Sequence, residues 1–116
     1  MLLFAKTHEW IKIDGKKGKV GISDHAQSEL GDIVYIELPE VGDEFSAGDV
    51  LCEIESVKAV SEIYAPVDGK VVAVNEALED SPELVNEDSM ANWICELEIK
   101  GDTAGLLSEE EYKKTI

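Results

Sequence analysis

The sequence contains no arginine, only two cysteines and three prolines, and no long apolar run. Ten lysines oppose 26 aspartates and glutamates, so the formal net charge is −16. Proteins that bind DNA, RNA or anionic lipid neutralise phosphates with Lys and Arg, so this composition argues against such ligands. The absence of arginine also removes the residue best suited to bidentate phosphate recognition. The acidity indicates either solubility alone or docking on basic partner surfaces.

The sequence also lacks the signals of a metal centre, a redox motif or a membrane segment. Cys52 and Cys95 match neither a zinc-ligand spacing nor a thioredoxin-like motif, so both are expected in the core. His8 and His25 are interpreted as far apart and without clustered ligands, so no metal site is expected. No apolar stretch is long enough to cross a bilayer. The first six residues resemble neither a secretory signal nor a transit peptide, so a cytoplasmic location is expected.

The length of 116 residues fits one domain, which we expect to span residues 1–116 with a helical segment from about residue 103. The Asp14-Gly15 pair predicts a hairpin between two short strands. Runs of β-branched and apolar residues predict the other strands, over 32–38, 50–55, 60–64, 70–75 and 93–99.

Two short helices are predicted from their end signals. Ser23 and Asp24 open a predicted helix over 24–30, Asp24 and Gln27 resemble a capping box, and Gly31 is a fitting stop. Ser108 and Glu111 resemble a second capping box, which predicts a helix over 108–113.

An internal repeat indicates how the strands are layered. Residues 31–36, Gly-Asp-Ile-Val-Tyr-Ile, are matched by Gly-Lys-Val-Val-Ala-Val at 69–74. Residues 51–55 and 94–98 share the pattern X-Cys-Glu-X-Glu. Chance could give such a match in a valine-rich β protein. Otherwise the repeat predicts two similar β-layers packed face to face, since neither could bury its apolar face alone. The predicted fold is all-β with short helices: a flattened two-sheet antiparallel sandwich with quasi-two-fold symmetry.

Lys58 differs from the other nine lysines in its surroundings. Val57, Ala59 and Val60 flank it, between two predicted strands that both continue past it. Because an ammonium group is costly to bury, the turn is expected to project Lys58 into water. The turn also lies in the segment that joins the two repeats. A lysine held out on a rigid hairpin suits covalent modification of its amine, although a plain solvent-facing lysine fits the position as well.

Residues 55–66, Glu-Ser-Val-Lys-Ala-Val-Ser-Glu-Ile-Tyr-Ala-Pro, resemble the lipoylation segment of the glycine cleavage system H protein family. Biotin carriers typically have Met on both sides of the lysine, and lipoyl domains of 2-oxo-acid dehydrogenases usually have Asp before it. Both features are absent here. Further matches to the family lie at 7–10, 21–27, 30–39, 74–78, 82–86, 106–108 and 111–112. Thr7 and Glu62 replace the more usual Ser and Asp, and residues 88–93 lack the usual Pro-Tyr and Gly.

The resemblance implies a barrel-sandwich hybrid of the lipoyl and biotinyl carrier type, and a carrier rather than an enzyme. Lys58 would bear lipoate in amide linkage, and an aminomethyl group from glycine would pass from the P protein to the T protein. The L protein would reoxidise the dithiol. The lipoate-attaching enzyme would recognise the residues around the lysine, namely Glu55, Ser56, Val57 and Ala59.

Three further residues, Thr7, Glu9 and Glu62, are candidates for docking the loaded arm, with Trp10 as an apolar wall. The arm ends in an amine, which would seek a carboxylate. Three alternatives stay open: a lipoyl relay that serves other complexes, a biotin carrier, and an unmodified acidic interaction module.

Overall fold

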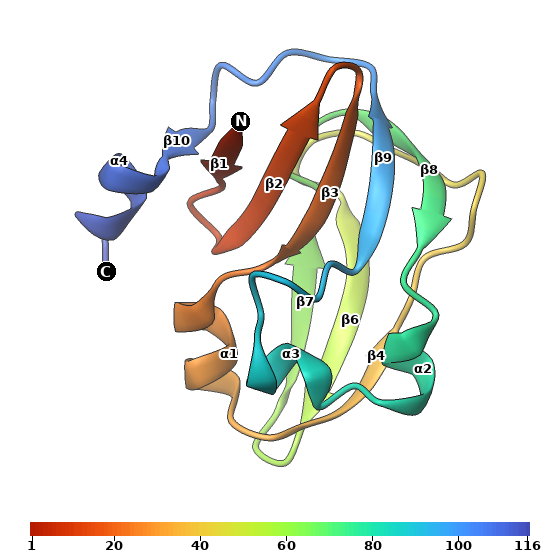
Figure 1. Cartoon of the computed structure of the whole chain (residues 1–116), viewed down its shortest axis with the longest axis vertical. Coiled ribbons are helices and arrows are strands. Elements are labelled where there is room, and N and C mark those ends of the chain that lie inside the picture. The colour runs from red at the N-terminus through yellow and green to blue at the C-terminus, as the bar shows by residue number, and fades with distance from the viewer.

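The structure is a computed structural model that describes residues 1–116, and it is a flattened sandwich of two antiparallel sheets (Figure 1). Its principal extents are 35 × 34 × 21 Å. The larger sheet has seven strands in the order β10-β1-β2-β3-β9-β8-β5, and the smaller has three in the order β4-β6-β7. The predicted all-β sandwich is therefore confirmed. The two layers are unequal because the N-terminal strands, β5 and β10 all join one sheet. No helix is long and apolar enough to cross a membrane.

The strands are short and are joined by turns or by short helices. The strands are β1 (Leu2–Phe4), β2 (Glu9–Asp14), β3 (Lys17–Ile22), β4 (Ile33–Glu37), β5 (Glu44–Phe45), β6 (Val50–Ser56), β7 (Val60–Tyr64), β8 (Gly69–Val74), β9 (Cys95–Ile99) and β10 (Leu107–Ser108). The helices are α1 (Asp24–Leu30), α2 (Ala77–Asp80), α3 (Leu84–Glu87) and α4 (Glu109–Lys113).

The internal repeat corresponds to one antiparallel strand pair in each sheet. β4 pairs with β6 in the smaller sheet, and β8 pairs with β9 in the larger. Each pair has an irregularity at the same place in the repeat, at Val34 and at Val72. The second strands carry Cys52 and Cys95, and both thiols are buried. Burial raises the pKa of both thiols, that of Cys95 to about 12, so they act as small core residues, as predicted.

The core lies between the sheets and draws on both. Ile36 and Ile54 pair directly across β4 and β6, and both are at most 1% exposed. They join one apolar cluster with residues of the opposite sheet, including Ile11, Val20 and Leu97. Alternate residues of β6 face the solvent, which is the pattern of a sheet that is buried on one side.

The predicted end signals of the helices are largely present. Gly31 ends α1 with a positive φ of 76°, and its N–H donates to the Gln27 carbonyl (3.0 Å). Ser108 and Glu111 form the predicted capping box of α4. Ser23 and Asp24 open α1 as predicted, but the predicted capping box of Asp24 with Gln27 was wrong. Ser23 is the N-cap and accepts from the Ala26 N–H (3.1 Å), because its hydroxyl lies just before the first turn.

Side-chain hydrogen bonds order the segment that departs from the family pattern, residues 88–93. The Asn92 amide donates to the carbonyls of Leu84 and Asp88, both at 2.9 Å. The Trp10 indole N–H donates to the Ser89 carbonyl (3.1 Å). These bonds tie the segment to α3 and to β2 without the usual Pro-Tyr and Gly residues.

Candidate functional site

The hairpin of β6 and β7 presents Lys58 at its tip, which protrudes at the lower edge of the molecule (Figure 1). Five ladder pairs hold the two strands together up to the pair Glu55–Val60. The two residues that flank the lysine in sequence, Val57 and Ala59, are exposed like Lys58 itself, and Val57 is 65% exposed. The tip is thus an accessible short segment on a rigid support, as the sequence predicted.

Ser56 organises the turn. Its hydroxyl accepts from the N–H groups of Lys58 and Ala59, both at 3.2 Å, and donates to the Ala59 carbonyl at 3.2 Å. The Ser56 N–H also donates to this carbonyl, at 2.8 Å. Ser56 is 7% exposed, so it faces inward while its neighbours face out. Its hydroxyl fixes the backbone of the tip, in the way that Ser commonly stabilises a turn.

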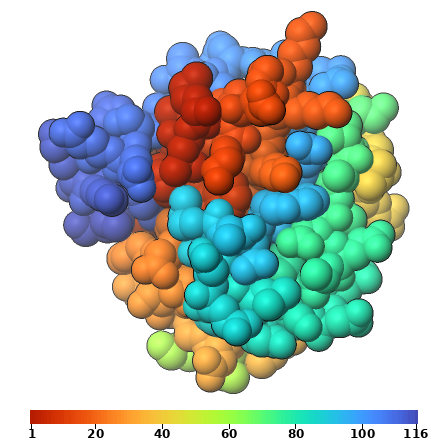
Figure 2. Space-filling model, viewed as in Figure 1, coloured from red at the N-terminus to blue at the C-terminus, as the bar shows by residue number.

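The tip leans on the connection between α1 and β4. The Val57 N–H donates to the Asp32 carbonyl at 3.0 Å. A Cβ placed on Gly31 would lie 3.3 Å from Cε of Lys58 and 3.7 Å from its Nζ, so the lysine stem passes over this glycine. In Figure 2 the yellow-green tip emerges at the lower edge beside the orange α1–β4 segment. Lys58 as a whole is exposed, but its stem lies against Gly31 and does not point freely into water.

A recess of about 170 Å³ lies close to the tip, between α1, the edge strand β7 and the Thr7-His8 turn. Glu62 and Thr7 both line it, so the structure brings two of the three candidate arm-docking residues together. Glu62 is four residues beyond Lys58, a span of at most about 14 Å along an extended chain. The other lining residues are His8, Ile22, His25, Ala26, Glu29, Leu30, Ser61 and Ile63.

Glu9, the third candidate, lies behind this recess and does not line it. It is 1% exposed, and its carboxylate accepts from the Thr7 hydroxyl and from the Tyr64 N–H, the latter at 3.1 Å. Burial raises the pKa of Glu9, while the two hydrogen bonds oppose the rise. Trp10 is equally buried and packs with Phe4 and Tyr112, not against the recess. Glu9 therefore holds Thr7 and the end of β7 in place.

The raised pKa of Glu9 predicts a pH-dependent stability. Just above the ordinary pKa of 4.5, the folded chain still holds a proton that the unfolded chain has released. The unfolding free energy should therefore fall as the pH rises through this window, by about 1.4 kcal/mol per unit of pKa difference. Glu9→Gln should remove this fall in urea titrations between pH 4 and pH 8. Glu53→Gln, which removes one exposed carboxylate, should keep it; equal slopes in both variants would contradict the prediction.

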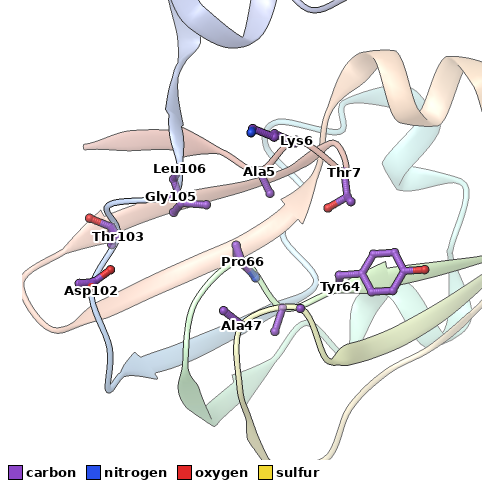
Figure 3. A pocket seen from close by; sticks show the side chains of 12 residues that line it. Ala5, Lys6, Thr7, Ala47, Tyr64, Pro66, Asp102, Thr103, Gly105 and Leu106 are labelled. Atoms are coloured by element: carbon purple, nitrogen blue, oxygen red, sulfur yellow. The ribbon is translucent and has the colours of Figure 1, made fainter.

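A larger hollow of about 670 Å³ lies beyond the far end of β7. In Figure 3, Thr7 and Tyr64 lie at one end and Asp102 and Thr103 at the other. Thr7 lines both cavities, and the Tyr64 hydroxyl donates weakly to Glu62 at 3.5 Å. Because Tyr64 is six residues from Lys58, an arm on the tip meets the smaller recess first.

His8 and His25 contradict the sequence interpretation that they are far apart. Their ring centroids lie 4.9 Å from each other, and both residues line the recess. The Tyr112 hydroxyl joins Nδ1 of His8 to Oγ of Ser23, at 2.7 Å on each side. Burial lowers the pKa of His8, and the neighbouring His25 lowers it further. His8 also has a positive φ of 80°, a conformation that local sequence does not predict.

Comparison with known proteins identifies the family of the chain. The family model "Glycine cleavage H-protein" matches residues 2–116. The chain belongs to this family. A probable glycine cleavage system H protein from Thermococcus gammatolerans is 58% identical, over 99% of this chain and 89% of its own length. One from Thermococcus kodakarensis is 67% identical over 83% and 72%. The crystal structure of a glycine cleavage system H protein from Mycobacterium marinum matches with a TM-score of 0.91 and 37% identity, covering 97% of this chain and 94% of that one.

Membership of the H-protein family confirms the resemblance that the segment around Lys58 indicated. It also confirms the sandwich fold, because the superposition covers nearly all of both chains. The neighbours His8, His25 and Glu29 around the recess were not among the predicted site residues. His25 belongs to residues 21–27, which resemble the family pattern. The sequence did not indicate that this segment lies beside Glu62 in the folded chain.

Proposed function

We propose that this chain is the lipoyl carrier of a glycine cleavage system and that Lys58 is its attachment residue. The observation that carries the proposal is an exposed lysine on a rigid tip, next to a recess that contains an exposed carboxylate. The amine of Lys58 can form a stable amide, and the small side chain of Ala59 leaves room for a modifying enzyme. When attached, lipoate would supply a dithiolane that accepts an aminomethyl group and is afterwards reoxidised.

The residues of this chain hold and present the arm. Ser56 fixes the backbone at its base, and Glu55 and Val57 form the exposed surface that the lipoate-attaching enzyme would read. Glu62 and Thr7 would receive the amine at the end of the loaded arm, and Glu9 would hold Thr7 from behind. The partners would be the P, T and L proteins, and the buried free thiols fit a reducing compartment such as the cytoplasm.

Intact mass of the protein purified from its own host tests the proposal. We expect the mass increment of one lipoyl group, located on the peptide that contains Lys58. A biotinyl increment or an unmodified lysine would contradict the proposal. Reconstitution with P, T and L proteins should then give glycine-dependent release of carbon dioxide, which would separate this role from a relay for other complexes.

The outer face of the smaller sheet carries a row of carboxylates that favours docking on basic partner surfaces. Glu37, Glu53 and Glu62 lie in register across its three strands, with Glu53 paired to both of the others. Like charges that face each other across strands destabilise a sheet, so the fold tolerates this row at a cost. The next row of outward-facing residues towards the tip consists of Tyr35, Glu55 and Val60. It adds one more carboxylate, that of Glu55, with exposed apolar side chains on both sides.

Association with the P and T proteins should therefore depend on salt. Raising the ionic strength from 0.1 M to 1 M shortens the Debye length from about 10 Å to about 3 Å. We expect the association rate constant to fall about tenfold or more and the dissociation rate constant to change less, because steering acts before contact. Stopped-flow measurements at several salt concentrations check this. Rates that do not depend on salt would mean that the acidity serves solubility alone.

A further inference from the structure

Asn86 of α3 makes three side-chain hydrogen bonds to a segment more than 50 residues away. Its amide nitrogen donates to the Gly31 carbonyl (2.8 Å) and to Oε1 of Gln27 (3.0 Å). Its side-chain oxygen accepts from the Ile33 N–H (2.9 Å). The side chain thus satisfies two backbone groups that flank Asp32, where α1 has ended and β4 has not yet begun. No other described hydrogen bond reaches the Ile33 N–H or the Gly31 carbonyl from a side chain.

The segment that Asn86 holds is the one on which the hairpin tip leans. Asp32 lies between the two bonded residues, and its carbonyl accepts from the Val57 N–H (3.0 Å). Gly31 lies under the stem of Lys58. A continuous chain of contacts therefore runs from Asn86 through residues 31–33 to the residue that precedes Lys58. A shift of this segment would move both the backbone anchor of the tip and the surface under the lysine stem.

We infer that Asn86 is a positioning residue for Lys58: it fixes the α1–β4 segment so that the tip is held ready for the lipoate-attaching enzyme. The inference rests on the proposed function, and it names a residue outside the segment 55–62. An enzyme that binds a preformed tip loses apparent affinity in proportion to the fraction of molecules in which the tip is displaced. The effect should therefore raise KM for the carrier and leave kcat nearly unchanged.

Asn92 provides a matched control. Its amide also donates two hydrogen bonds to backbone carbonyls, those of Leu84 and Asp88, both at 2.9 Å. Both asparagines are half-buried and lie in the same region of the chain. The bonds of Asn92, however, end within α3 and the residue after it, and none reaches residues 31–33 or the tip. A substitution at Asn92 thus reports the general effect of losing such bonds.

The experiment compares Asn86→Asp with Asn92→Asp in the full, unmodified chain. Asn86→Asp removes both donated bonds and sets a carboxylate against two carbonyl oxygens. We expect amide exchange at Val57, followed by NMR, to become about tenfold faster, which corresponds to about 1.4 kcal/mol. We also expect KM for enzymatic lipoylation to rise as the fraction of molecules with the tip in place falls, reaching tenfold when that fraction is about one in ten. Asn92→Asp should change neither the exchange rate at Val57 nor KM by more than about twofold. This difference between the two variants should hold when both unfold at the same urea concentration.

Each outcome decides the inference. Equal exchange at Val57 in Asn86→Asp and wild type, or an equal rise of KM in Asn92→Asp, would overturn it. If Asn86→Asp does not fold, Asn86→Ala removes the two donated bonds and also the bond accepted from the Ile33 N–H, without adding a charge, and carries the same expectations. Failure of both Asn86 variants to fold would overturn it too, because Asn86 would then serve overall stability. Failure of the proposed function is distinct: the wild-type chain itself would not accept lipoate.

Discussion

Lys58→Arg should abolish lipoylation and carrier activity together while leaving the fold intact. Arginine keeps the positive charge and much of the stem, but its guanidinium does not form the same stable amide with an activated acyl group. Because the residue is exposed on a turn, the substitution should change the unfolding free energy by less than about 0.5 kcal/mol. Intact mass after incubation with the lipoate-attaching enzyme measures attachment, and urea unfolding measures stability.

Lys70→Arg is the matched control for this prediction. Lys70 is also exposed, but it lies on β8 of the larger sheet, away from the tip. This variant should accept lipoate as wild type does. Lipoyl label that persists on Lys58→Arg would show that Lys58 is not the attachment residue. Label that is also lost from Lys70→Arg would show that loss of label does not identify the attachment residue.

Local sequence predicted the hairpin around Lys58 well because its signals are close together in the chain. The strands on either side are rich in apolar residues, which in places alternate with polar ones. The short segment between them contains Lys58, whose ammonium group is costly to bury. The strand β7 was predicted with its observed bounds, and the helix α1 likewise. The repeat also predicted the two layers, since its two strand pairs lie one in each sheet.

Other features depend on contacts that sequence does not report. β1, β5 and β10 are two or three residues long and exist because a partner strand satisfies their backbone groups. The contact of His8 with His25 requires the turn before β2 to meet α1. The family pattern marked residues 82–86, but it did not indicate that the Asn86 side chain reaches Gly31.

The burial of Glu9 is a further feature that the sequence did not predict. The segment Thr7-His8-Glu9-Trp10 resembled the family pattern, but alternation along β2 does not say which carboxylate opens onto a cavity. The structure places Thr7 in the wall of the recess and Glu9 behind it, bonded to the Thr7 hydroxyl. This leaves Glu62 and Glu29 as the carboxylates that line the recess.

Glu62→Gln should therefore shorten the lifetime of the aminomethyl group on the loaded carrier. The group is prone to hydrolysis, and its amine should be cationic near neutral pH. An exposed ion pair contributes only about 0–1 kcal/mol, whereas a sheltered charge-assisted hydrogen bond contributes about 1.5–3 kcal/mol. Because Glu62 is exposed, its loss should shift the docked equilibrium by about fivefold at most, at about 1.4 kcal/mol per decade. Formaldehyde and ammonia should be released correspondingly faster, with lipoylation unchanged.

Glu53→Gln separates a specific contact of Glu62 from the charge of the whole sheet face. Glu53 pairs directly with Glu62 across β6 and β7, so either substitution removes the same like-charge contact. Glu53, however, does not line the recess. If Glu62 binds the amine, Glu62→Gln releases the group faster and Glu53→Gln does not. If Glu29→Gln has this effect and Glu62→Gln has none, the amine binds at the α1 side of the recess. If neither variant differs from Glu53→Gln, the loaded arm does not dock in this recess.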